Sequence, residues 1–185
     1  MEIMGIAVVS LDGCLTRHDQ PGSAFASHED QAHFRATLAS CDATIMGRIT
    51  FDGERERILA SSDPGRLRVV LTRSPHAYRD LERPGALEFT AAPPGELTTA
   101  LARRGTRRAA LLGGGRVYAL FADAGLVSRW VITVEPLLFG GGTRLLEGRT
   151  DRRLELLESR RMNESGTLLL TYRDPDALTA LERGM

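Results

Sequence analysis

The chain has 185 residues, of which 42% are hydrophobic and 26% are charged, so a globular core is expected without disulfide or metal staples. The 24 basic and 24 acidic residues cancel to a formal net charge of zero, and a nucleic-acid partner is not expected because such surfaces usually carry a basic excess. The basic residues other than histidine are all arginine, which excludes a catalytic lysine and a lysine-bearing phosphate loop.

Short apolar runs alternate with helical segments along most of the chain. In chain order, we expect a strand over Ile3–Ser10, a helix capped by Ser27, a strand over Ala43–Met46, a helix over Arg48–Leu59, and strands over Arg68–Leu71 and Leu87–Thr90. A helix over Gly95–Arg103, a strand over Ala109–Leu112, a helix over Arg116–Ala124 and a strand over Val127–Val134 follow. An antiparallel pair, Leu154–Glu158 with Leu168–Arg173, ends the pattern.

This order predicts an α/β fold with a mostly parallel central sheet, helices on both faces and an antiparallel C-terminal edge. We expect one domain over residues 1–185, with a core over 1–173 and a tail over 174–185. The apolar start is too short for a membrane span, and neither Cys14 nor Cys41 lies in a metal-binding motif. A cytoplasmic protein without a metal site or a membrane partner is therefore predicted.

Three turns that follow predicted strands have the composition of phosphate sites. Gly47, Arg48 and Thr50 follow the second strand, and Leu71, Thr72, Arg73 and Ser74 end the third. Gly113, Gly114 and Gly115 separate an apolar strand from an apolar helix, which begins with Arg116, Val117 and Tyr118. Glycine lets a backbone approach a ligand, and helix N-termini attract anions. We expect the main-chain amides after Met46 and Leu112 to converge on one diphosphate.

These residues carry a family resemblance. The patterns M-G-R-x-T-F from Met46, V-x-L-T-R from Val69 and G-G-G-x-V-Y from Gly113 resemble the dihydrofolate-reductase-like superfamily. The S-x-D-G sequence from Ser10 and the E-P-L-L-F-G-G-G sequence from Glu135 are similar to the reductase domain of the bifunctional riboflavin-biosynthesis deaminase–reductase.

The resemblance implies a three-layer α/β/α sandwich, NADPH as the hydride donor and a homodimer. It implies that the three turns bind the cofactor, with Gly47, Arg48 and Thr50 near its phosphates, Leu71 to Ser74 around the adenosine and Gly113 to Tyr118 along the pyrophosphate. It also implies that the substrate lies near Asp12 and Asp30.

The roles of the substrate-side residues stay open at this point. Asp12 either orients a substrate or, as we favour, forms a turn with Gly13, and Asp30 either binds substrate or serves only at the start of its helix. Phe25 either stacks on a planar ring or covers the core. Glu135, at a strand end before Pro136, is expected to be exposed.

Three functions follow from this reading. The first is an NADPH-dependent reductase of a small heterocycle or a ribosylaminopyrimidine, of the 5-amino-6-(5-phosphoribosylamino)uracil reductase type. The second is a dihydrofolate or pterin reductase. The third is a nucleotide-binding protein without catalysis, which is motivated by substrate-side differences: the riboflavin reductases usually carry a glutamate where Gly113 stands and a tryptophan where Phe25 stands.

Overall fold

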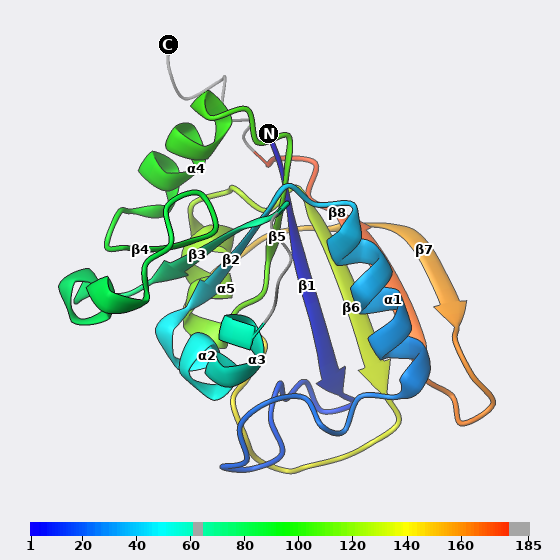
Figure 1. The fold of residues 1–185 in the computed structure, drawn as a ribbon. Helices are drawn as coiled ribbons and strands as arrows, with labels where there is room; N and C mark the ends of the chain where they lie inside the picture. The colour runs from blue at the N-terminus through cyan, green and yellow to red at the C-terminus, as the bar shows by residue number, and fades with distance from the viewer. Residues whose placement is uncertain (61–64, 178–185) are drawn as a thin grey trace.

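The computed structural model describes residues 1–60 and 65–177, in which eight strands form one sheet (Figure 1). The strands are β1 (Glu2–Ser10), β2 (Ala43–Gly47), β3 (Leu67–Leu71), β4 (Leu87–Thr90), β5 (Arg108–Leu111), β6 (Arg129–Glu135), β7 (Glu155–Arg161) and β8 (Leu168–Arg173). The helices are α1 (His28–Ala39), α2 (Arg48–Gly53), α3 (Arg55–Ala60), α4 (Pro94–Arg103) and α5 (Gly115–Asp123), with a 3₁₀ helix, η1, at Pro75–Leu81.

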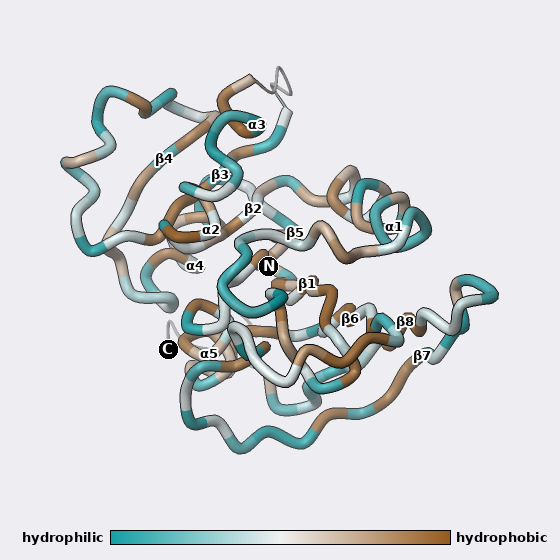
Figure 2. Tube along the Cα trace, turned by 90° about the horizontal axis from the view of Figure 1, so that it is seen from below, coloured by the Kyte–Doolittle hydropathy of each residue, from teal (hydrophilic) through white to brown (hydrophobic). Residues whose placement is uncertain are grey.

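The strands lie in the order β4-β3-β2-β5-β1-β6-β8-β7. The six from β4 to β6 are parallel, whereas β8 runs antiparallel to β6 and β7 antiparallel to β8. Parallel strands end at one edge of a sheet, which is the lower edge in Figure 1 and the edge that faces the viewer in Figure 2. Ligands of open α/β sheets bind at this edge, so the predicted turns all lie where a site is expected.

Alternating side chains of the strands build cores on both faces of the sheet. On one face, Leu101 of α4 and Phe121 of α5 pack with Ile3, Ile45 and Leu111. The other face carries one cluster under α1, in which Phe34 and Leu38 pack against strand residues, and a second cluster under α2, α3 and η1. The result is the predicted three-layer sandwich, with an antiparallel pair at its C-terminal edge.

The observed elements differ from expectation in several places, of which the largest concern the helices after β2 and the end of β7. The helix predicted over Arg48–Leu59 is two short helices that break at Gly53, and the η1 turn was not predicted. Strand β7 extends to Arg161, beyond the predicted Glu158. Residues 178–185, which include most of the predicted tail, lie outside the described residues. Within residues 1–60 and 65–177, the helices are too short or too polar to cross a membrane.

Candidate active site

The first and third predicted turns lie side by side, because β2 and β5 are neighbours in the sheet. The Gly47 amide donates a hydrogen bond to the Gly113 carbonyl at 2.7 Å, and the Leu112 amide donates to the Ile45 carbonyl at 2.8 Å. The two turns therefore open at the same edge of the sheet, as expected from the sequence.

One detail of that expectation is wrong. The Gly47 amide, which follows Met46, is engaged by the Gly113 carbonyl and is not free for a diphosphate. The amides at the start of α5 are better placed, because the N-cap residue Gly114 has no side chain to accept from them. Uncapped amides at a helix start carry partial positive charge and bind anions.

The three glycines of the third turn meet different surroundings. A Cβ at Gly113 would lie 2.3 Å from the Tyr118 ring at a φ of +81°, and a Cβ at Gly115 would lie 2.4 Å from the Arg144 carbonyl. Internal packing thus requires glycine at both positions. At Gly114, the nearest atom to such a Cβ among the described residues is Thr50 Oγ1, at 3.7 Å. Packing within the chain does not require glycine at this position, which favours close approach of a ligand.

The second predicted turn lies next to the first, because Leu71 at the end of β3 pairs with Gly47 at the end of β2. The Thr72 hydroxyl accepts the Ser74 amide at 3.2 Å and shapes the turn, which leaves Arg73 exposed. Arg48 is also exposed and pairs with Asp52 at 2.9 Å. The guanidinium groups of Arg48 and Arg73 thus follow two adjacent strands, and guanidinium groups are suited to bind phosphate.

The remaining residues of the third motif point in different directions. Arg116 is exposed and lies 3.6 Å from Glu147. Val117 and Tyr118 are buried, and the Tyr118 hydroxyl donates to the Ile6 carbonyl. Burial raises the pKa of Tyr118. The side chains of Val117 and Tyr118 therefore belong to the core, and their amides donate to the Gly114 carbonyl at 2.8 and 3.0 Å.

The Asp12 carboxylate is fully engaged within the protein. It accepts hydrogen bonds from the Ser10 hydroxyl at 2.6 Å and from the amides of Phe139 at 3.2 Å and Gly140 at 2.8 Å. These donors lower the pKa of Asp12 to about 2 from 3.8, with the Ser10 hydroxyl the largest cause. Asp12 thus ties the loop after β1 to the loop after β6, which is a long-range contact that differs from the local turn with Gly13 favoured by the sequence, and a role in orienting a substrate stays a prediction.

Phe25 packs within the same pair of loops. Its ring meets the Phe139 ring edge to face, with 4.9 Å between centroids, and the Arg17 guanidinium lies 5.1 Å from the Phe139 centroid on that ring. The ring of Phe25 is half-buried by this contact. Its packing role is therefore visible in the structure, and stacking on a substrate stays a prediction.

Asp30 has the environment of a functional acid. It lies in the first turn of α1, is 8% exposed, and is hydrogen-bonded to the Thr133 side chain of β6. Burial raises its pKa, and the nearby negative charge of Glu135 raises it further, against the lowering effects of Thr133 and His33. A buried carboxyl group with a raised pKa is suited to hold or transfer a proton.

Glu135 was expected to be exposed, and this expectation is wrong. Its side chain is 4% exposed, and its two oxygens accept from the Ser27 amide at 2.7 Å and the Thr167 hydroxyl at 2.6 Å. Alternation along β6 carried the signal, because Val131, Thr133 and Glu135 share the face that packs against α1. Alternation shows which residues share a face, but whether that face is buried depends on the fold. The burial of Glu135 was therefore not predictable from the sequence alone.

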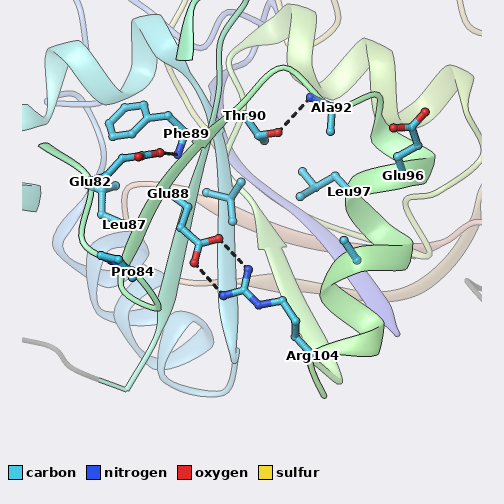
Figure 3. Close-up of a pocket in the computed structure, with 12 residues that line it drawn as sticks. Glu82, Pro84, Leu87, Glu88, Phe89, Thr90, Ala92, Glu96, Leu97 and Arg104 are labelled. Carbon is cyan, nitrogen blue, oxygen red and sulfur yellow. Dashed lines mark hydrogen bonds and ion pairs between the residues drawn. The ribbon is translucent and has the colours of Figure 1, made fainter. Parts of the chain in front are cut away.

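A separate pocket of about 560 Å³ lies between α4 and β4 (Figure 3). Apolar side chains that include Val69 and Leu97 line it, and Arg104 forms a two-point ion pair with Glu88 at 2.7 and 2.8 Å beside it. None of the predicted site residues lines this pocket. It is therefore distinct from the site at the strand ends.

Solved structures share this fold. A pyrimidine reductase-like protein from Corynebacterium diphtheriae has a TM-score of 0.72 at 17% identity, over 94% of this chain and 91% of that one. A diaminohydroxyphosphoribosylaminopyrimidine deaminase/5-amino-6-(5-phosphoribosylamino)uracil reductase from Thermotoga maritima has a TM-score of 0.70 at 14% identity, over 94% of this chain and 56% of that one. Dihydrofolate reductase from Enterococcus faecalis, complexed with NADP(H), has a TM-score of 0.64 at 18% identity, over 94% of this chain and 96% of that one.

At these identities the likeness concerns the fold, and no curated protein matches the chain significantly. The family is shown by the sequence itself, because residues 3–168 match the profile of the RibD C-terminal domain. That span includes the three turns, Asp12, Asp30 and Glu135. The chain therefore belongs to the RibD C-terminal domain family, a family of riboflavin-pathway reductase-like domains with the fold of dihydrofolate reductase.

Proposed function

We propose that the protein is an NADPH-dependent reductase of a small heterocyclic or ribosylaminopyrimidine substrate. The observation that carries the proposal is the open backbone at Gly114, beside the Thr50 hydroxyl and at the uncapped start of α5. A Cβ at this position would make only ordinary contact with Thr50, so packing among the described residues does not explain why the position is glycine. The residues present therefore fit a diphosphate-bearing cofactor.

The chain's own residues divide the work between cofactor and substrate. The start of α5 and Thr50 would hold the diphosphate, and Arg48 and Arg73 are the groups that would bind the additional phosphate of NADPH. When bound, NADPH supplies a hydride to a C=N or C=O bond of the substrate. Asp30, with its raised pKa, would hold a proton on a carboxyl oxygen and bind or protonate the substrate ring.

The test of the cofactor proposal is a titration of purified protein with NADPH and NADH, followed by fluorescence and melting temperature. We expect NADPH to bind below millimolar concentration. The double variant Arg48→Ala/Arg73→Ala should weaken NADPH much more than NADH, because only NADPH carries the extra phosphate. Arg103→Ala/Arg107→Ala, which removes two exposed charges at the opposite edge of the sheet, is the matched control. Absence of binding to either cofactor contradicts the proposal.

The substrate proposal requires turnover. Cofactor oxidation is measured with 5-amino-6-(5-phosphoribosylamino)uracil and with dihydrofolate, which is included because the fold is shared with dihydrofolate reductase. We expect turnover of the ribosylaminopyrimidine. Turnover of dihydrofolate alone would instead support a pterin reductase. Cofactor binding without turnover of any heterocycle would indicate a nucleotide-binding protein.

We further propose that the protein forms a homodimer through the outer face of β7 and β8. Leu156 and Leu168 are 54% and 41% exposed, and strand pairing places them with Leu170 on one face. Exposed neighbouring leucines are typical of a protein–protein interface. Figure 2 shows the hydrophobic start of β7 at the rim of the molecule. A cytoplasmic location is also proposed, and the burial of Cys14 and Cys41 as free thiols is consistent with it.

A further inference from the structure

Glu135 is a buried carboxylate that the proposed chemistry does not use, and it contacts the chain at the start of α1. Glu135 accepts the Ser27 amide on Oε1 and the Thr167 hydroxyl on Oε2, at 2.7 and 2.6 Å. A buried carboxylate is costly unless donors satisfy both of its oxygens, and hydrogen bonds to a charged group are stronger than neutral ones. Glu135 therefore makes firm contacts with both partners.

These contacts connect three elements that are distant in sequence. Ser27 precedes α1, Glu135 ends β6 and Thr167 precedes β8. A second link lies alongside, because the Asn163 amide donates to Thr167 Oγ1 at 3.0 Å and to Glu29 at 3.1 Å. The first turn of α1 is thus attached to the sheet at two points.

Asp30 belongs to that same turn. The Ser27 hydroxyl accepts the Asp30 amide at 3.3 Å, and the Asp30 carboxyl bonds to Thr133, two residues before Glu135 on the same strand. One segment of β6 therefore holds the Asp30 side chain through Thr133 and its backbone surroundings through Glu135.

We propose that Glu135 is a positioning residue that fixes the start of α1, and with it the Asp30 carboxyl group, against β6 and β8. The consequence for substrate binding and proton transfer rests on the proposed reductase function. The positioning itself does not depend on that function, and it is measurable without cofactor or substrate.

The charge of Glu135 gives the proposal a distinctive readout. Two charged side chains act on Asp30: Glu135 from β6 raises its pKa, and His33 from α1 lowers it. Glu29, on the same turn, is engaged by Asn163. Removal of the Glu135 charge is therefore expected to lower the pKa of Asp30, an effect that loss of packing alone does not produce.

The first experiment uses Glu135→Gln, which keeps the side-chain shape and can still accept the Ser27 amide. The Asp30 carboxyl carbon is titrated by ¹³C NMR in the full chain and assigned with Asp30→Asn. We expect its midpoint to move to lower pH in Glu135→Gln and to stay in place in Glu158→Gln, which removes an exposed carboxylate from β7. An unmoved midpoint in Glu135→Gln would overturn the proposal.

The second experiment keeps the charge and removes one bond, so it remains decisive even if Glu135→Gln fails to fold. Thr167→Val should speed amide exchange over residues 27–30, measured by mass spectrometry, relative to Thr171→Val on the same face of β8. Equal exchange in the two variants would contradict a positioning role. Neither experiment uses NADPH, so failure of the cofactor titration and failure of this inference are separate outcomes.

Discussion

At the scale of single residues, the Gly113–Gly115 triplet shows how one motif combines folding and binding requirements. Gly113 has a positive φ and faces the Tyr118 ring, and Gly115 faces the Arg144 carbonyl, so each is needed by the fold. Gly114 has an ordinary φ of −67°, and a Cβ there would make only ordinary van der Waals contact with Thr50. Substitutions at neighbouring positions are therefore expected to affect different properties.

We predict that Gly113→Ala lowers stability by an amount on the order of 1–3 kcal/mol or more, because alanine meets both an unfavourable φ and a ring. Gly114→Ala should fold but lose at least about tenfold in NADPH affinity, equivalent to about 1.4 kcal/mol. Urea denaturation and cofactor titration measure the two effects. Gly53→Ala, where a Cβ has ordinary contact with Pro21, is the control. Full NADPH affinity in Gly114→Ala would contradict the proposed cofactor site.

Asp12 leads to a prediction about pH. Its folded-state pKa of about 2 lies below its ordinary 3.8 because hydrogen bonds favour the charged form. The stabilisation is therefore present above pH 3.8 and is lost as the pH falls towards 2. Asp12→Asn should be less stable than the wild type at neutral pH, and this difference should shrink with acidification. Urea midpoints measured across this range test it, with the exposed Asp151→Asn as control. A constant difference would be inconsistent with the linkage.

At the scale of elements, the start of α1 depends on a local cap and on long-range contacts. Ser27 has extended backbone angles, and its hydroxyl accepts the Asp30 amide. A serine N-cap was predictable from the sequence, because the capping residue and the capped amide are three positions apart. The contact of the Ser27 amide with Glu135 was not predictable in this way, because it joins residues 108 positions apart.

We predict that Ser27→Ala destabilises the protein by roughly 0.5–2 kcal/mol, because the cap hydrogen bond is lost. Ser27→Asp should retain most of the stability, since aspartate also caps helices well. The exposed Ser23→Ala is the matched control, and urea denaturation gives the free energies of unfolding. Equal stability of Ser27→Ala and Ser23→Ala would show that the cap contributes nothing.

At the scale of the whole molecule, the strand order decides which sequence motifs become neighbours. The turns after β2 and β5 are 66 residues apart, from Gly47 to Gly113, yet they share a backbone hydrogen bond. The strand order also leaves β7 at one edge of the sheet, with both of its faces exposed. An exposed edge strand with apolar side chains favours pairing with another chain unless it is protected.

The proposed dimer gives the prediction at this scale. Light scattering of the wild type should give twice the chain mass of 20.2 kDa. Leu156→Glu/Leu168→Glu should reduce it to the chain mass, because charges would be buried in the interface. Leu120→Glu, on the exposed side of α5, should leave the mass unchanged. A doubled mass in the Leu156→Glu/Leu168→Glu variant would show that the interface lies elsewhere.

The sequence by itself determined most of the elements of this protein and the composition of its turns. Runs such as Ile3–Ser10 and Ala43–Met46 have strand patterns, and Ser27 marks a helix start, because these signals depend on neighbouring residues. The family motifs at Met46, Val69 and Gly113 are likewise continuous in the sequence. The fold class and the family were therefore predicted correctly before any contact between distant residues was known.

Only the tertiary structure decided how those residues are used. It showed that the Gly47 amide is engaged by Gly113, that Asp12 holds a neighbouring loop, and that Glu135 is buried beside Ser27 and Thr167. Each of these outcomes depends on which donors and acceptors meet across the sheet. Hydrogen bonding and burial are properties of such distant pairs, so local sequence patterns, which record only near neighbours, do not contain them.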